Sequence, residues 1–139
     1  MLKIILNRLK RQAEKIIAEE QAGFRAGRST TEQIFNLWII CEKYLQHQQD
    51  LYHVFIDFEK AFTGFWHAAL WATKKYTISA NLTQVIKNLY YEAASAVLFK
   101  RSIGDWFQTV GVRQGCLLSP TLFNIFLERI MTDALKVRS

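Results

Sequence analysis

A single carboxylate, Asp57, directly follows the apolar run 54–56. It is the residue whose position most directly suggests chemistry. The β-branched and aromatic residues of this run predict a strand over about 51–58 that is buried on both faces. A buried carboxylate without a partner costs several kcal/mol, on the order of other buried-ion penalties. A divalent cation shared with a phosphate-bearing ligand is one such partner. The alternative is that Asp57 ends the strand at solvent.

Two arginines, each close to a glycine, form a second candidate site in the segment 21–31. The glycines interrupt the helical spacing, so Arg25 and Arg28 lie in a loop where guanidinium groups could approach a phosphate. The GxxxxGK[ST] pattern is absent, which excludes a Walker phosphate loop. An exposed turn without any ligand has the same composition, so both interpretations stay open.

The elements that must position these residues are mostly helices. Apolar residues at three-to-four spacing predict helices over 2–20, 32–48, part of 60–76, the segment after Ser79 or Asn81, and the segment after Ser119 and Pro120. Ser29 with Glu32 predicts a capping box at the start of the second helix. In the last helix, Leu122, Phe123, Phe126, Leu127, Ile130 and Met131 are expected to form the buried face.

A period of two replaces the helical spacing over 95–99 and 106–112. This alternation predicts a β-hairpin in which Gly104 supplies the flexibility of the turn. The complete order is helix, Gly/Arg loop, helix, strand, helices, hairpin and helix. We therefore expect an α+β fold in which helices pack on a small antiparallel sheet with vulnerable edges.

Charge is concentrated near the start of the chain. The net charge is +6, and seven of the eighteen basic residues fall within the first 28 positions of the 139-residue chain. Such asymmetry fits a polyanionic partner, although a basic helix face in contact with water is the commoner explanation. Half of the residues are apolar, which is enough to build the core of one domain.

Cysteines and apolar runs exclude several classes of protein. Cys41 and Cys116 are far apart, so neither a disulfide framework nor a zinc site is indicated. No apolar run is long enough to span a bilayer, and the N-terminus lacks the features of a signal peptide. We expect an intracellular protein, nuclear or cytoplasmic, that is neither secreted nor bound to a membrane.

Three stretches, in this order, resemble reverse transcriptases. Residues 21–33 are similar to the segment that precedes motif A in non-LTR (LINE-type) retrotransposon enzymes, residues 55–62 resemble motif A, and residues 111–123 resemble motif B. The resemblance covers nearly the whole chain. It implies a partial right-hand polymerase, with fingers-side helices and the Gly/Arg loop in about 1–50 and a partial palm in about 51–139.

The resemblance assigns Asp57 to the motif A aspartate that binds the two catalytic Mg²⁺ ions, joined by the backbone carbonyl of Phe58. Those ions activate a primer hydroxyl and stabilise the departing pyrophosphate. Phe62 falls where the family keeps an aromatic gate that rejects the 2′-hydroxyl of an incoming ribonucleotide. Packing of Phe62 in the core is an equally good interpretation.

The same resemblance places Gln114 and Gly115 in the motif B turn, close to the incoming nucleotide and the template strand, where a missing side chain permits close approach. Arg25 and Arg28 fall in the fingers region, and contact with template phosphates is our own inference for them. The implied partners are an RNA template, a DNA primer and deoxynucleoside triphosphates.

The chain also departs from the family. Motif C, with its Ala-Asp-Asp sequence, is absent from the 139 residues, and Thr63 stands where a second motif A aspartate is usual. One carboxylate out of three would leave two Mg²⁺ ions largely unscreened. The sequence therefore predicts a fragment, without a thumb, that is inactive alone. A non-catalytic nucleic-acid-binding remnant and a decayed copy without function are the alternatives.

Overall fold

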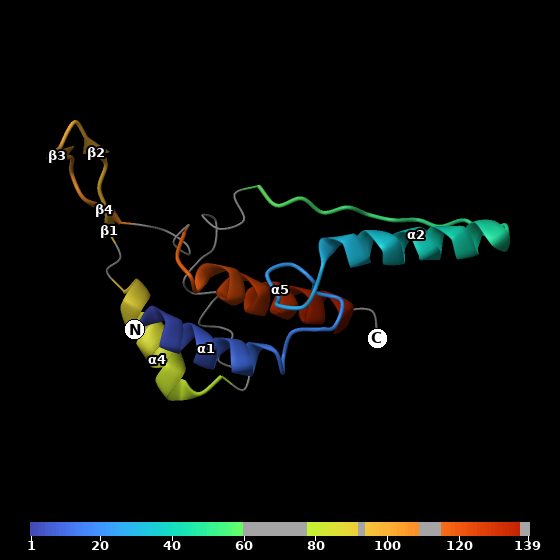
Figure 1. The fold of residues 1–139 in the computed structure, drawn as a ribbon, viewed down its shortest axis with the longest axis horizontal. Helices are drawn as coiled ribbons and strands as arrows, with labels where there is room; N and C mark the ends of the chain where they lie inside the picture. Colours follow the sequence, from blue (N-terminus) through green and yellow to red (C-terminus); the bar gives the residue numbers. More distant parts are fainter. Residues whose placement is uncertain (60–77, 92–93, 109–114, 137–139) are drawn as a thin grey trace. The chain divides into compact units, whose positions relative to one another are not determined.

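The computed structural model describes residues 1–59, 78–91, 94–108 and 115–136. The chain divides into two compact units, and each is considered by itself. The first unit comprises Met1–Ile17 and Lys60–Ser139, and the second unit comprises Ala18–Glu59. Figure 1 shows the order of the helices and strands along the chain.

Three helices build the core of the first unit: α1 (Leu2–Ala13), α4 (Ala80–Tyr90) and α5 (Ser119–Lys136). Each contributes apolar side chains at helical spacing, and packing these stripes together removes them from water. The buried cluster consists of Ile5, Leu9, Ala13, Ile17, Leu82, Ile86, Tyr90, Leu118, Leu122 and Ile125. This cluster confirms the predicted amphipathic character of the helices.

Helix α1 is shorter than the predicted span of 2–20. It ends at Ala13, where the hydrogen bonds change to the tighter spacing of three residues, from Lys15 N–H to the Gln12 carbonyl and from Ile16 N–H to the Ala13 carbonyl. Ile17 still reaches the core, because its N–H binds the Ala13 carbonyl at 2.9 Å and keeps the chain coiled for one more turn. The apolar spacing continues past the end of the α-helix itself.

Helix α4 confirms one of the two predicted caps. The Ser79 hydroxyl accepts a hydrogen bond from the Leu82 N–H at 3.3 Å, so Ser79 rather than Asn81 is the N-cap. The Ser79 N–H in turn donates to Gln12 Oε1 at 2.8 Å. This polar bond fixes the start of α4 against α1.

Helix α5 buries only the first part of the predicted face. Leu122 is buried and Phe123 and Phe126 pack against the core, but Ile130 and Met131 are 39% and 47% exposed. The buried positions of α5 all lie between Ser119 and Ile125, because only the first half of this helix packs against the core cluster. No helix in the described part of the chain is both long enough and apolar enough to cross a membrane.

The predicted hairpin forms, but its turn is displaced. Strands β2 (Leu98–Phe99) and β3 (Ser102–Ile103) pair around a two-residue turn, and β1 (Ala94–Ser95) pairs with β4 (Phe107–Gln108); both pairs are antiparallel (Figure 1). The turn residues Lys100 and Arg101 both have positive φ, 46° and 67°.

Gly104 therefore lies outside the turn, and the prediction that Gly104 forms part of the turn is wrong. Between the two strand pairs, two residues on one side face three on the other, which is the arrangement of a β-bulge, and Gly104 lies in it. Its N–H donates to the Val97 carbonyl at 2.9 Å. The part of the prediction that covers 109–112 lies outside the described residues, as does the predicted helix within 60–76.

In the second unit, helix α2 (Thr30–Gln46) has the predicted capping box. The Ser29 hydroxyl accepts from the Thr31 N–H at 3.1 Å, and the Ser29 N–H donates to the Glu32 carboxylate at 3.3 Å. None of the α2 side chains is buried.

The far end of α2 closes with a Schellman motif, in which Gln48 takes the left-handed conformation with φ 50°. The Gln49 N–H binds the Tyr44 carbonyl at 2.9 Å, and the Gln48 N–H binds the Leu45 carbonyl at 3.1 Å. Both ends of α2 are thus closed by local hydrogen bonds.

The predicted buried strand over 51–58 is wrong for this structure. These residues follow α2 as an extended segment without a strand assignment (Figure 1). Val54, Phe55 and Ile56 are 85%, 79% and 71% exposed. A strand is stabilised by hydrogen bonds and side-chain pairs to a neighbouring strand, and the described residues provide no such neighbour for this segment.

Candidate functional site

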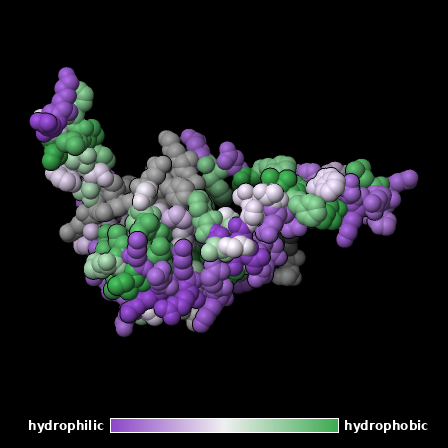
Figure 2. Space-filling view, in the orientation of Figure 1, coloured by the Kyte–Doolittle hydropathy of each residue, from purple (hydrophilic) through white to green (hydrophobic). Residues whose placement is uncertain are grey.

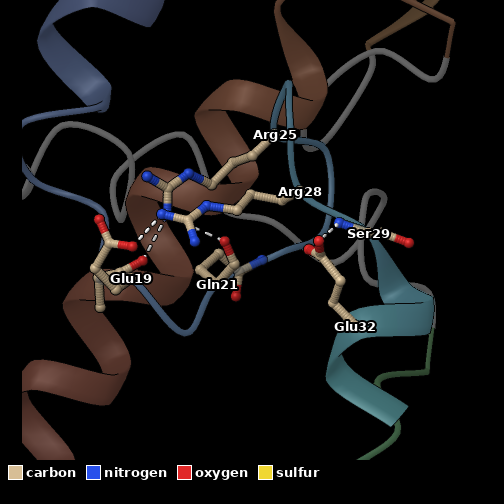
Figure 3. A network of polar contacts seen from close by, with 7 residues as sticks. Glu19, Gln21, Arg25, Arg28, Ser29 and Glu32 are labelled. Atoms are coloured by element: carbon tan, nitrogen blue, oxygen red, sulfur yellow. Dashed lines mark hydrogen bonds and ion pairs between the residues drawn. The ribbon is translucent and has the colours of Figure 1, made fainter. Parts of the chain in front are cut away.

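The Gly/Arg loop is organised by its own arginines. Arg25 Nη1 donates to the carbonyl oxygens of Ala18 at 2.6 Å and Gln21 at 3.1 Å. Arg28 forms an ion pair with Glu19, and Figure 3 shows both guanidinium groups directed toward Glu19 and Gln21. The structure therefore brings Arg25 and Arg28 together, in a cluster that holds the loop closed.

Through these contacts the two arginines stabilise the conformation of the loop. A guanidinium group has five N–H donors in a planar fork, and here loop carbonyls and Glu19 accept from the two arginines. Arg28 is about one-third exposed, and its partner Glu19 is largely exposed. Contact of Arg25 and Arg28 with template phosphates stays a prediction, which would require the phosphate to approach donors already placed by the loop.

Two residues with positive φ allow the loop to turn back on itself. Phe24 has φ 58° and Gly27 has φ 73°. A Cβ built at Gly27 meets no atom within 4 Å, so backbone conformation rather than space favours glycine there. Phe24 accepts the same strain without being glycine, which marks the Gly23–Gly27 segment as tightly constrained.

Asp57 and Phe58 lie in the exposed extended segment rather than in a buried strand. The Asp57 side chain is exposed, and Phe58 is 47% exposed. Across residues 1–59, 78–91, 94–108 and 115–136, no three His, Cys, Asp or Glu side chains come close enough to hold a metal ion. The described residues alone therefore do not complete a site for the Mg²⁺ pair that the resemblance implies, and no catalytic step through a metal follows from them.

Gly115 is the described member of the predicted motif B turn. It has φ 85°, and a Cβ built on it meets no atom within 4 Å, so a substitution is opposed by backbone strain and not by crowding. It directly precedes the turn that leads into α5, where the Ser119 N–H binds the Cys116 carbonyl at 3.2 Å. Phe62 and Gln114, the other predicted nucleotide contacts, lie outside the described residues.

The structure also reveals a cavity that the sequence did not predict. A space of about 670 Å³ is lined by α1 and by the first turns of α4. Arg8 and Arg11 of α1 line it together with Lys15, which lies in the turn after α1. Their spacing of three and four residues is typical of one helix face, and this was the only signal in the sequence that could have selected these three from the other basic residues of the segment.

Comparison with known proteins gives a consistent result. A protein family described as "Reverse transcriptase (RNA-dependent DNA polymerase)" matches residues 1–138. The chain is 30% identical to the "RNA-directed DNA polymerase from mobile element jockey" of Drosophila melanogaster. The aligned region covers 95% of this chain and 15% of that protein. The chain is also 30% identical, over 89% of its length, to 14% of the "Probable RNA-directed DNA polymerase from transposon BS" of the same species. The chain thus spans about one-seventh of the length of these relatives.

Proposed function

The chain belongs to the reverse transcriptase (RNA-dependent DNA polymerase) family, and on that premise we propose that it is part of the RNA-directed DNA polymerase of a non-LTR retrotransposon. The observation that carries this proposal is the family match over residues 1–138, which includes all three motif-like stretches in their expected order. The proposal assigns about 1–50 to the fingers and about 51–139 to the palm. Its substrates are an RNA template, a DNA primer and deoxynucleoside triphosphates.

Within this proposal, Asp57 and the Phe58 carbonyl are ligands of the catalytic Mg²⁺ ions, and Phe62, Gln114 and Gly115 contact the incoming nucleotide. Because Asp57 is exposed, this assignment rests on the resemblance to motif A and not on burial of the carboxylate. The 139 residues contain no Asp-Asp pair, so the remaining metal ligands are not present in this chain. We therefore propose that the 139-residue chain does not extend a primer by itself.

A chimeric enzyme tests the proposal most directly. Residues 1–138 of this chain would replace the matching part of the jockey polymerase, and deoxynucleotide incorporation on a primed RNA template would be measured with Mg²⁺. We expect incorporation that Asp57→Asn abolishes and that the matched nearby control, Asp50→Asn, retains. A folded chimera with no incorporation would contradict the proposal.

The chain alone provides the complementary measurement. Under the same conditions, we expect the purified 139-residue chain to incorporate no more nucleotide than its Asp57→Asn variant. Incorporation that disappears with Asp57→Asn and persists with Asp50→Asn would overturn the proposed inactivity, while it would support the assignment of Asp57.

A second candidate function, nucleic-acid binding without catalysis, is favoured by the basic face of α1. Binding of this kind weakens steeply as salt is added, because phosphate contacts release counterions. It would also be unchanged by Asp57→Ala. Affinity for RNA that is insensitive to salt would exclude this candidate.

A further inference from the structure

The cavity of the first unit combines two chemical characters. Arg8 and Arg11 of α1 and Lys15 of the turn after it provide three cations, and Ile4, Leu82 and Val85 provide an apolar wall. In Figure 2, hydrophilic and hydrophobic surfaces meet over α1 and α4. The volume of about 670 Å³ lies within the range of roughly 300–1,000 Å³ that small-molecule sites occupy.

The side chains of Arg8, Arg11 and Lys15 take no part in the ion pairs or side-chain hydrogen bonds of the described residues, and the cavity lining contains no acidic residue. This differs from Arg25 and Arg28, which close their loop. Like charges three and four residues apart repel each other and destabilise a helix slightly. Arg11 in the last turn of α1 also stabilises the helix through its dipole. The cavity nevertheless places three exposed cations beside an apolar wall, which is an arrangement suited to an anionic ligand with an apolar part.

The apolar wall restricts the kind of anion. Ile4 and Val85 remain 62% and 43% exposed beside the cations. An inorganic phosphate has no apolar group that could contact such a surface. A nucleotide has an apolar base face as well as a phosphate. Seven positions separate Arg8 from Lys15, which is about 10 Å or more along a coiled chain that rises ~1.5 Å per residue in α1, and this gives room for more than one phosphate.

We propose that the cavity between α1 and α4 binds single-stranded nucleic acid, with successive phosphates on Arg8, Arg11 and Lys15 and one base against Ile4, Leu82 and Val85. A single strand fits because its bases can leave the stack and expose their faces, which the bases of a duplex do not. The inference rests on the proposed function in taking nucleic acid as the polyanion. It adds a binding surface outside the three motif-like stretches.

Fluorescence anisotropy with a labelled twelve-nucleotide oligouridine tests the proposal. The triple variant Arg8→Gln, Arg11→Gln, Lys15→Gln should bind roughly 10- to 100-fold more weakly at low salt. The slope of log affinity against log salt should also fall in magnitude by about 2, since each single-strand phosphate contact contributes ~0.7. These side chains are exposed, so the fold should persist, and circular dichroism would verify this.

Matched variants separate the cavity from general charge. The triple variant Lys3→Gln, Lys10→Gln, Lys87→Gln removes equal charge from the first unit outside the cavity lining and should change affinity by less than about threefold. Arg8→Lys with Arg11→Lys keeps the charge and should retain binding. Ile4→Ser with Val85→Ser should weaken binding by about three- to tenfold with an unchanged salt slope, because only the base contact is lost.

Three outcomes would overturn the proposal. The first is equal affinity of the wild type and the Arg8, Arg11 and Lys15 triple variant. The second is duplex RNA bound as tightly as the single strand. The third is tighter binding to phosphatidylserine vesicles than to the oligonucleotide, which would mark a membrane surface instead. Because this assay measures binding and the chimera measures incorporation, either proposal can fail without the other.

Discussion

The two units of the chain use amphipathic helices in opposite ways. In the first unit, α1 buries Ile5, Leu9 and Ala13 against α4 and α5. In the second unit, α2 also carries apolar residues at helical spacing, though it is less amphipathic than α1, and it buries no residue; Ile34 and Trp38 are 70% and 54% exposed. Amphipathic spacing therefore predicts where a helix forms, whereas burial requires a partner surface.

What replaces burial in the second unit is a set of short-range polar contacts. The capping box starts α2, the Schellman motif ends it, and the arginines of the preceding loop bind carbonyls and Glu19 (Figure 3). On α2 itself, Phe35 and Trp38 contact each other with ring centroids 5.8 Å apart. Local contacts of this kind contribute less than an apolar core, so we expect the second unit to open at a lower free energy than the first.

The largest expected difference between the units comes from truncating an apolar side chain in each. Leu9→Ala, at a position with 0% exposure, should lower the free energy of unfolding by about 2–5 kcal/mol. Ile34→Ala, on the exposed face of α2, should change it by less than about 0.5 kcal/mol. Urea unfolding followed by circular dichroism measures both. Equal losses would mean that the α2 face is covered in solution and would break the comparison.

Removing the N-cap of α2 should have the next largest effect. Ser29→Ala deletes the acceptor for the Thr31 N–H and should destabilise α2 by about 1 kcal/mol, whereas Ser29→Asp keeps an acceptor and should be nearly neutral. Hydrogen exchange of the α2 amides reports this change. Unchanged exchange in the Ser29→Ala variant would show that something other than capping holds α2.

At the other end of α2, a glycine should stabilise the helix end at one position and destabilise it two positions earlier. Gln48 has φ 50°, so Gln48→Gly relieves backbone strain and should stabilise the helix end by a few tenths to about 1 kcal/mol. Gln46→Gly, within the helix, should destabilise it by about 0.5–1 kcal/mol. The same exchange experiment measures both, and effects of the same sign would argue against the Schellman motif.

The smallest expected effect concerns one ion pair from each unit. Arg28→Gln removes the pair with Glu19, and Arg129→Gln removes the pair with Asp133, whose atoms are 2.6 Å apart. Both pairs are partly exposed, so each loss should be roughly 0–1 kcal/mol and should shrink further in 1 M salt. A larger, salt-insensitive loss for Arg28→Gln would show that this arginine organises the loop beyond its charge.

Predictions from local spacing and capping were the most accurate. Ser29 with Glu32 and Ser79 with Leu82 cap α2 and α4 as expected, because a cap depends on residues within three positions of each other. The hairpin was also found, although its turn lies at Lys100 and Arg101. Both adopt a positive φ that glycine accepts more readily, so the position of Gly104 was misleading.

The sequence predicts the environment of the candidate site residues less accurately than it predicts the caps. Asp57 was expected to be buried in a strand, and the structure places it in an exposed segment, because a strand needs a neighbour that local sequence does not specify. Arg25 and Arg28 were selected for their charge, but their partners Ala18, Gln21 and Glu19 precede the loop and could not be identified from spacing alone.

The sequence by itself determined the family, the approximate positions of the described helices and the capping box of α2, since these depend on residue identity and on contacts a few positions apart. Only the tertiary structure decided which apolar faces are buried, which half of α5 joins the core, and which cations stay available. In the sequence, Arg8, Arg11 and Lys15 differ from Arg25 and Arg28 only in lying at helical spacing instead of beside glycines, which does not say which of them have partners. The packing of α4 beside α1 leaves the first three without acidic neighbours in the cavity they share, while the fold of the loop engages the other two.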